Sequence, residues 1–228
     1  MKNIPRIYIN ENLEVGRSFP VSRDIAHYLT RVMRTDRCLV FNYGKEFKAE
    51  LSVVSCSLLV VSPTGRPDPS NNLTLAFAPV KQARMEEMLS MATQMGVKRL
   101  QPVITAFVNE HHPKWERIKK IVIEAAEQSG RNSVPELAEP QKFTEFLQGV
   151  KDLVFADERA ASPRSFPDSG LALHAPRNDT IVLIGSEGGF SDAEFDALDK
   201  AGATGINLGP TILRAEVAAV VAIAKVVG

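Results

Sequence analysis

Two stretches decide the fold: Leu183-Ile184-Gly185-Ser186-Glu187-Gly188-Gly189-Phe190-Ser191 and Leu208-Gly209-Pro210-Thr211-Ile212-Leu213-Arg214-Ala215-Glu216. Each is an apolar, strand-like run that stops at glycine and then opens into a helical pattern. Such junctions bring bare backbone N–H and C=O groups to the carboxyl end of a sheet, where α/β proteins usually bind ligands. Two junctions in one short domain predict a single ligand held by backbone groups from both loops.

The segments around these junctions alternate between strand and helix patterns, which is typical of an α/β domain with a mostly parallel sheet. We expect this domain to span residues 71–228. Its strand-like segments are 73–80, 99–104, 152–156, 180–184 and 205–208. Its helix-like segments are 83–95, 113–129, a helix that begins at Asp192 behind the capping box Ser191-Asp192-Ala193-Glu194, and 212–227.

The front of the chain, residues 1–70, has a different pattern. Short strand-like runs occur at 6–9, 38–41, 47–51 and 57–61, with a hairpin turn at Asn42-Tyr43-Gly44-Lys45 and a helical segment at 22–34. A stretch rich in Pro, Asn and Ser follows at 62–72 and marks a boundary. This pattern predicts a small β-barrel, of a size typical of accessory RNA-binding modules.

Composition sets outer limits on function. The 228 residues have zero formal net charge, but residues 1–70 carry 10 Lys and Arg against 7 Asp and Glu, while residues 151–228 carry 7 against 11. The basic front end is compatible with an RNA partner or with a solvated surface. Two isolated cysteines and four histidines without ligand spacing predict no disulfide and no metal site. No apolar run reaches membrane-spanning length, and we expect a cytoplasmic protein.

The glycine-rich loop has two physical interpretations. Gly188 and Gly189 remove side chains where a ligand can approach the backbone, and the following helix N-terminus favours a partial negative charge such as a carboxylate. A tight strand–helix turn without a ligand explains the same residues. The loop is neither a G-x-G-x-x-G fingerprint nor a P-loop, which weighs against nicotinamide cofactors and nucleoside triphosphates.

Arg214 and Glu216 lie at the start of an otherwise apolar helix. Ionisable groups at the mouth of a buried helix are costly unless they are paired or used. A simple Arg–Glu pair is one explanation, and a place in the active site beside the second glycine junction is the other.

The two glycine stretches resemble the paired motifs of SPOUT-type RNA methyltransferases, and the RsmE family in particular, which methylates N3 of a uridine in 16S ribosomal RNA. Three further stretches are similar to that family: His27-Tyr28-Leu29-Thr30-Arg31-Val32-Met33-Arg34, the helical segment 85–97, and Ala125-Ala126-Glu127-Gln128-Ser129-Gly130-Arg131-Asn132. The similarity runs in order from about Pro5 to about Lys225.

The resemblance implies a PUA-like RNA-binding barrel at 1–70 and a SPOUT methyltransferase domain with a C-terminal trefoil knot at 71–228. It implies a homodimer that binds S-adenosylmethionine in the knot and acts on ribosomal RNA or the small ribosomal subunit. The implied cofactor-binding residues are Leu183, Ile184, Gly185, Glu187, Gly188, Gly189, Leu208, Gly209, Ile212 and Leu213.

Uridine N3 becomes a good nucleophile only after it loses its proton. An Arg stabilises the resulting anion and a carboxylate accepts the proton. Arg214 is the candidate for the first role, and Glu216 or Glu187 for the second. The candidate RNA contacts are the basic residues of the front helix and of loops at strand or helix ends: Arg31, Arg34, Lys81, Arg84 and Arg131.

Four residues, at three places in the chain, depart from the family pattern. The family usually continues with Glu-Arg after residue 105, often has a basic residue at 211 and commonly has Thr at 217, whereas this chain has Ala106-Phe107, Thr211 and Val217. These departures bear on substrate recognition. They leave two rivals open: a methyltransferase that acts on tRNA or 23S ribosomal RNA, and an RNA-binding protein without catalysis.

Overall fold

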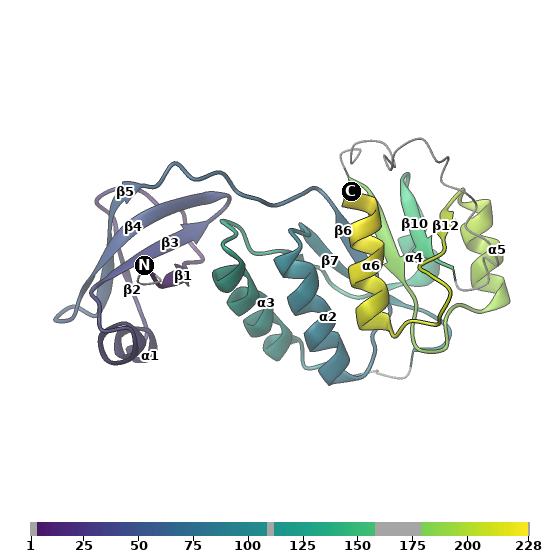
Figure 1. Ribbon diagram of the computed structural model, residues 1–228, viewed down its shortest axis with the longest axis horizontal. Coiled ribbons are helices and arrows are strands. Elements are labelled where there is room, and N and C mark those ends of the chain that lie inside the picture. Colours follow the sequence, from purple (N-terminus) through teal and green to yellow (C-terminus); the bar gives the residue numbers. More distant parts are fainter. Residues whose placement is uncertain (1–3, 109–111, 158–178, 228) are drawn as a thin grey trace. The chain divides into compact units, whose positions relative to one another are not determined.

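The computed structural model describes residues 4–108, 112–157 and 179–227, which form two compact units (Figure 1). The first unit comprises Met1–Ser70 and Ile123–Val134, and the second comprises Asn71–Val122 and Pro135–Gly228. Residues 123–134 therefore pack with the first unit, although the sequence pattern assigns them to the middle of the second domain.

The first unit is built on a curled five-stranded sheet with the order β1-β3-β4-β5-β2 (Figure 1). Its strands are β1 (Arg6–Tyr8), β2 (Ser18–Pro20), β3 (Arg37–Asn42), β4 (Lys45–Ser52) and β5 (Ser57–Pro63). β1 pairs with β3 in parallel, and the other neighbours pair antiparallel. Alternate side chains such as Val40, Leu58 and Val60 point inward and are buried in a shared apolar core.

The turn between β3 and β4 is the predicted hairpin. Tyr43 and Gly44 occupy its two central positions with φ values of 48° and 76°. Positive φ at both positions is the signature of a type I′ turn, whose twist matches that of the flanking strands. The hairpin at 42–45 is therefore confirmed.

Arg131 is buried in the first unit, with 1% of its surface exposed. Its guanidinium donates a hydrogen bond to the Ser70 hydroxyl at 2.9 Å. Burial lowers the pKa of Arg131 to about 10, and the nearby Asp68 carboxylate opposes that shift. The prediction that Arg131 contacts RNA was therefore wrong: the guanidinium that follows helix α3 (Trp115–Ser129) is used inside the fold.

Arg6 fixes the same segment to the sheet. Its guanidinium donates hydrogen bonds to the carbonyl oxygens of Ala126, Glu127 and Arg131 at 3.1, 3.1 and 2.6 Å. These carbonyls include ones from the last turn of α3, where the helix itself provides no donor. An ion pair between Arg6 and the buried Glu46, at 3.0 Å, holds the guanidinium in place.

In the described part of the chain, the second unit has a seven-stranded sheet. Six strands follow the order β12-β10-β11-β6-β7-β8, and β9 pairs with β7. The strands are β6 (Thr74–Phe77), β7 (Arg99–Ile104), β8 (Glu136–Leu137), β9 (Gln141–Lys142), β10 (Leu153–Ala156), β11 (Ile181–Ile184) and β12 (Thr204–Ile206). Every pairing is parallel, which confirms the predicted α/β class with a mostly parallel sheet.

Helices cover both faces of this sheet. α2 (Gln82–Gln94) and α6 (Ala215–Val227) lie side by side on one face (Figure 1). α4 (Phe143–Phe146) and α5 (Asp192–Lys200) contribute aromatic residues to a core on the other. In that core the Phe190 ring lies edge-on to Phe155 and Phe195, with centroids 6.1 and 5.7 Å apart. Phe190 follows the first glycine junction, so this packing anchors the loop.

Candidate active site

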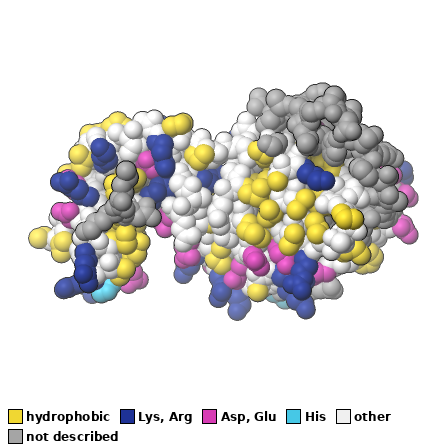
Figure 2. All heavy atoms as spheres, viewed as in Figure 1, with side chains coloured by type: hydrophobic (Ala, Val, Ile, Leu, Met, Phe, Trp, Pro, Cys, Tyr) yellow, Lys and Arg dark blue, Asp and Glu magenta, His cyan; other side chains and the backbone are white. Residues whose placement is uncertain are grey.

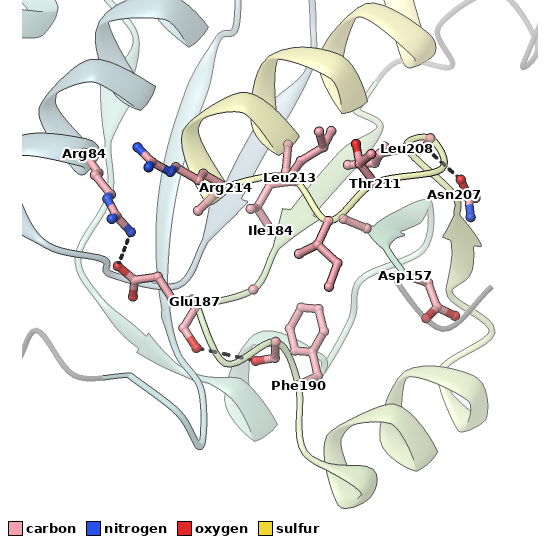
Figure 3. Close-up of a pocket in the computed structure, with 18 of the residues that line it drawn as sticks. Arg84, Asp157, Ile184, Glu187, Phe190, Asn207, Leu208, Thr211, Leu213 and Arg214 are labelled. Carbon is pink, nitrogen blue, oxygen red and sulfur yellow. Dashed lines mark hydrogen bonds and ion pairs between the residues drawn. The ribbon is translucent and has the colours of Figure 1, made fainter. Parts of the chain in front are cut away.

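A pocket of about 350 Å³ lies where the two glycine junctions meet at the carboxyl end of the sheet (Figure 3). One wall is the loop from β11 to α5, and the other is the loop from β12 to α6. The residues that line it are Arg84, Ala156, Asp157, Ile184, Gly185, Ser186, Glu187, Gly189, Phe190, Phe195, Asn207, Leu208, Gly209, Pro210, Thr211, Ile212, Leu213, Arg214, Ala215 and Ala218. The predicted convergence of both loops on one site is thus present in the structure.

The first loop is a tight turn that requires glycine. A Cβ atom on Gly185 would lie 3.2 Å from the Phe190 ring and 3.3 Å from the Gly189 carbonyl. Gly189 has a φ of 69°, in the left-handed region that favours glycine. The loop ends at the predicted capping box, where the Ser191 side chain accepts from the Glu194 N–H and the Glu194 carboxylate accepts from the Ser191 N–H.

The second loop is longer than the sequence pattern predicts. β12 ends at Ile206 and α6 begins at Ala215, whereas the pattern extends the strand to 208 and begins the helix at 212. The loop is held by Asn207, whose side-chain oxygen accepts from Gly209 N–H at 2.7 Å and whose carbonyl accepts from Lys225 Nζ at 2.8 Å. Residues 212–214, which the sequence pattern assigns to the helix, are therefore part of the loop that forms the pocket wall.

The predicted cofactor-binding residues lie mostly on the pocket surface. Those that line it are Ile184, Gly185, Glu187, Gly189, Leu208, Gly209, Ile212 and Leu213. Leu183 and Gly188 are not among its lining residues. Leu183 points into the core from β11, and a Cβ on Gly188 would lie 3.0 Å from Phe107 Cβ.

Arg214 and Glu216, the two ionisable residues predicted at the start of the last helix, differ in their position relative to the pocket. Arg214 lines the pocket and lies toward the same end of it as Arg84 and Glu187 (Figure 3). Glu216 is in the first turn of α6, is 5% exposed and does not line the pocket. Its Oε2 atom has no hydrogen-bond partner among the described residues. Arg214 ends the loop before α6 and Glu216 lies in the first turn of that helix, so the two side chains leave the backbone in different directions.

Of the two candidates for the proton acceptor, Glu187 lines the pocket and Glu216 does not. Its carboxylate accepts a hydrogen bond from Arg84 in an ion pair of 3.1 Å (Figure 3). Both side chains are about one-third exposed, at 32% for Arg84 and 29% for Glu187, so the pair can be reached from solvent. Arg84 was predicted as an RNA contact, and in this structure it lies at the pocket itself.

Sequence reasoning missed Asp157 and Asn207 as pocket residues. Both follow directly on strand ends, Asp157 after β10 and Asn207 after β12. The position of polar residues at the carboxyl ends of adjacent parallel strands was the signal that could have identified them. Figure 3 shows Asp157 and Asn207 toward the end of the pocket opposite Arg84.

The other predicted RNA contacts are exposed, but not in the expected arrangement. Lys81 is the exposed N-cap residue of α2. Arg31 lies in the π-helical turn η1 (Tyr28–Val32), which continues α1 (Arg23–His27). Arg34 lies beyond that turn with a φ of 53°. Arg31 and Arg34, both predicted on the front helix, therefore do not lie on one regular helical face, because the helix widens and then ends before Arg34.

No group of three or more His, Cys, Asp or Glu side chains in ranges 4–108, 112–157 and 179–227 is arranged to hold a metal ion. Within those same ranges, none of the helices has the length and apolar character needed to cross a membrane.

Comparison with known proteins identifies the family of this fold and pocket. A family model described as "RNA methyltransferase domain" matches residues 66–227, which include both glycine loops. The chain belongs to this RNA methyltransferase family. It is 32% identical over 231 residues to the ribosomal RNA small subunit methyltransferase E of Rickettsia conorii, covering 97% of this chain and 94% of that protein.

Solved structures extend the similarity to the whole described fold. The chain superposes on a ribosomal RNA small subunit methyltransferase E from Neisseria gonorrhoeae bound to S-adenosylmethionine with a TM-score of 0.82 and 29% identity, covering 97% of this chain and 96% of that one. A Legionella pneumophila protein described as a methyltransferase in complex with bound S-adenosylmethionine gives a TM-score of 0.81 and 28% identity, with the same coverages of 97% and 96%.

Proposed function

We propose that this protein transfers a methyl group from S-adenosylmethionine to N3 of a uridine in 16S ribosomal RNA. The observation that carries the proposal is the pocket where two glycine junctions meet beside Arg214, in a chain similar over nearly its full length to a structure with bound S-adenosylmethionine. A ribosomal substrate assigns this activity to the cytoplasm.

The pocket residues fit this cofactor. Gly185 is packed so closely that it has no room for a side chain, which leaves its backbone bare toward the pocket. The backbones of Gly189 and Gly209 border the same space, and Ile184, Phe190, Leu208 and Leu213 give it apolar residues. Backbone hydrogen-bonding groups combined with apolar walls suit a ligand that has both an aromatic base and polar groups.

In the proposed reaction the protein has to orient the two substrates and stabilise the charge that develops on the uridine. When bound, S-adenosylmethionine supplies a methyl group that is already electrophilic because it is attached to a sulfonium. Arg214 would stabilise the uridine anion that forms when N3 loses its proton. Glu187 would accept that proton, because it lies in the pocket and Glu216 does not.

The decisive experiment compares modified nucleosides in ribosomal RNA from cells with and without this protein. We expect N3-methyluridine to disappear from 16S ribosomal RNA in the deletion strain and to return when purified protein and S-adenosylmethionine are added to that RNA. Loss of the mark from tRNA or 23S ribosomal RNA would favour the first rival function. An unchanged set of nucleosides, with RNA binding retained, would favour the non-catalytic one.

Calorimetry tests the cofactor separately. We expect S-adenosylmethionine to bind the purified protein equally well with and without a metal chelator, because the proposed contacts are backbone groups and apolar side chains. Absence of binding, or binding that the chelator abolishes, would contradict this cofactor assignment.

We also propose that the first unit is a PUA-like RNA-binding barrel and that the second contains the trefoil knot of SPOUT enzymes. The curled five-stranded sheet and the exposed Arg31 and Arg34 support the first assignment. The pocket between the β11–α5 and β12–α6 loops supports the second, because the resemblance places the cofactor in the knot.

The RNA-binding role of the first unit is testable through salt dependence. Changing both Arg31 and Arg34 to Ala should weaken binding to ribosomal RNA and flatten the slope of log affinity against log salt, because fewer counterions are released. The affinity for S-adenosylmethionine should not change. RNA binding that stays the same at low salt would remove the two arginines from the interface.

The second unit is proposed to form a homodimer. On α6, Val217 and Val227 are 42% and 39% exposed. Figure 2 shows hydrophobic side chains gathered on the face of the second unit where α6 lies in Figure 1. Contact with a second copy would remove this apolar surface from water.

Light scattering at micromolar concentration should report about twice the chain mass of 25.0 kDa. A monomer that methylates RNA at full rate would contradict the dimer.

A further inference from the structure

An exposed aromatic ring lies beside the first glycine loop and is not accounted for by the cofactor pocket. Phe107 follows β7 and is 44% exposed. It is not one of the residues that line the pocket. Single exposed apolar residues are common on protein surfaces, so it is the position of Phe107 at the edge of the pocket, and not its exposure alone, that points to a role.

The chain segment that carries Phe107 is fixed to the start of α5. The backbone N–H of Ala106 donates a hydrogen bond to Glu194 Oε1 at 2.8 Å. The other oxygen of Glu194 accepts from the N–H and the hydroxyl of Ser191, at 2.8 and 3.0 Å. Glu194 is 8% exposed, so these bonds are shielded from water. The backbone next to Phe107 is therefore tied to the end of the glycine loop.

The side chain of Phe107 rests on the glycine loop itself. A Cβ atom on Gly188 would lie 3.0 Å from Phe107 Cβ and 3.3 Å from its Cγ. Gly188 lies between Glu187 and Gly189, which both line the pocket. One part of the ring is thus held against the backbone of the pocket wall, while 44% of the residue remains open to solvent.

We propose that Phe107 is a stacking platform for a nucleobase that neighbours the methylated nucleotide in the RNA. This inference rests on the proposed function. A ring that the fold already holds in place loses little conformational entropy when a base stacks on it, and unpaired bases of RNA are commonly bound in this way. Positive charge for the phosphates is present at the same loop, because Arg84 pairs with Glu187, the neighbour of Gly188, and Lys81 is exposed one turn earlier at the start of α2.

Three variants distinguish stacking from simple apolar contact. Phe107→Ala should lower kcat/KM for the RNA and its binding affinity by about 10- to 100-fold, on the scale of one lost base–aromatic stack. Phe107→Tyr should remain close to wild type, because it retains the ring. Phe107→Leu should behave like Phe107→Ala, because it retains apolar bulk without a π-face. The affinity for S-adenosylmethionine, measured by calorimetry, should stay the same in all three.

An abasic scan of the RNA identifies the stacked base. RNA fragments that lack one base at a time near the target uridine should show a position where wild-type binding falls. The Phe107→Ala variant should bind the RNA that lacks this base as tightly as it binds the intact RNA, because its stack is already absent. If the affinity lost by removing a base and the affinity lost in Phe107→Ala add up at every position, the inference is overturned.

The other outcomes are also decisive. If Phe107→Leu matches wild type, the ring does not stack. If Phe107→Ala converts a dimer to a monomer in light scattering, the ring belongs to an interface with a second copy, and the inference fails. Wild-type protein that methylates no RNA would refute the proposed function, and RNA affinities of the three variants would still test the stack. Active wild type with an equally active Phe107→Ala would refute the stack alone.

Discussion

Arg214→Ala is expected to lower the single-turnover rate of RNA methylation by about 100-fold or more, on the scale of removing one donor that stabilises transition-state charge. Arg214 is exposed at the pocket, at the end of the second loop and immediately before α6. Arg214 is proposed to stabilise the uridine anion. The methylation rate should therefore fall even when RNA and S-adenosylmethionine are both saturating. Arg214→Lys should rescue only part of it, because an ammonium lacks the planar fork of a guanidinium.

The alternative role for Arg214 is a structural pair with Glu216, and the structure gives it little support. Glu216 Oε2 is buried and accepts no hydrogen bond from the described residues, Arg214 included. We therefore expect Arg214→Ala to keep its melting temperature and its affinity for S-adenosylmethionine. Arg117→Ala is a matched control, because it removes an exposed arginine of the same unit from its ion pair with Glu86.

A structural role would give a different pattern. Arg214→Ala would then lower the melting temperature and the cofactor affinity together, and adding Glu216→Ala would restore stability. That pattern, with the methylation rate preserved at saturating S-adenosylmethionine, would remove Arg214 from the catalytic residues.

The parts of the site that the sequence predicted correctly are those governed by local backbone chemistry. Gly185 and Gly189 are required by a tight turn, and Ser191 with Glu194 caps the helix that follows. Each of these constraints acts within a few residues, so the order of residues encodes it directly. The type I′ hairpin at Tyr43 and Gly44 was predictable for the same reason.

The parts that the sequence did not predict depend on distant segments. Ile212 looks like the start of an apolar helix, but it is 86% exposed in a loop whose first residue, Asn207, is held by the distant Lys225. Arg131 looks like a surface cation after a helix, but Ser70, 61 residues away, accepts its hydrogen bond inside the first unit. The short strands β2, β8 and β9 have two or three residues each, too few for a periodic pattern.

Gly185→Val is expected to raise the dissociation constant for S-adenosylmethionine by about 10- to 100-fold. The added side chain would begin 3.2 Å from the Phe190 ring and 3.3 Å from the Gly189 carbonyl, and both belong to the wall of the pocket. Phe190 cannot move away easily, because it packs against Phe155 and Phe195. Relief of this clash must move backbone that borders the pocket, and the loss of one or two cofactor hydrogen bonds of about 1.4 kcal/mol each corresponds to about 10- to 100-fold in affinity.

Gly202→Ala separates this local effect from a general loss of stability. Gly202 follows α5, has a φ of 70° and has no atom within 4 Å of an added Cβ, so its substitution introduces backbone strain without a steric clash. That variant should lower the melting temperature and leave cofactor affinity unchanged. Gly185→Val should show the loss of affinity in calorimetry even well below its melting temperature. If it binds S-adenosylmethionine as tightly as wild type, the loop after β11 does not form the cofactor wall. A loss of methylation under those conditions would then assign this loop to the RNA.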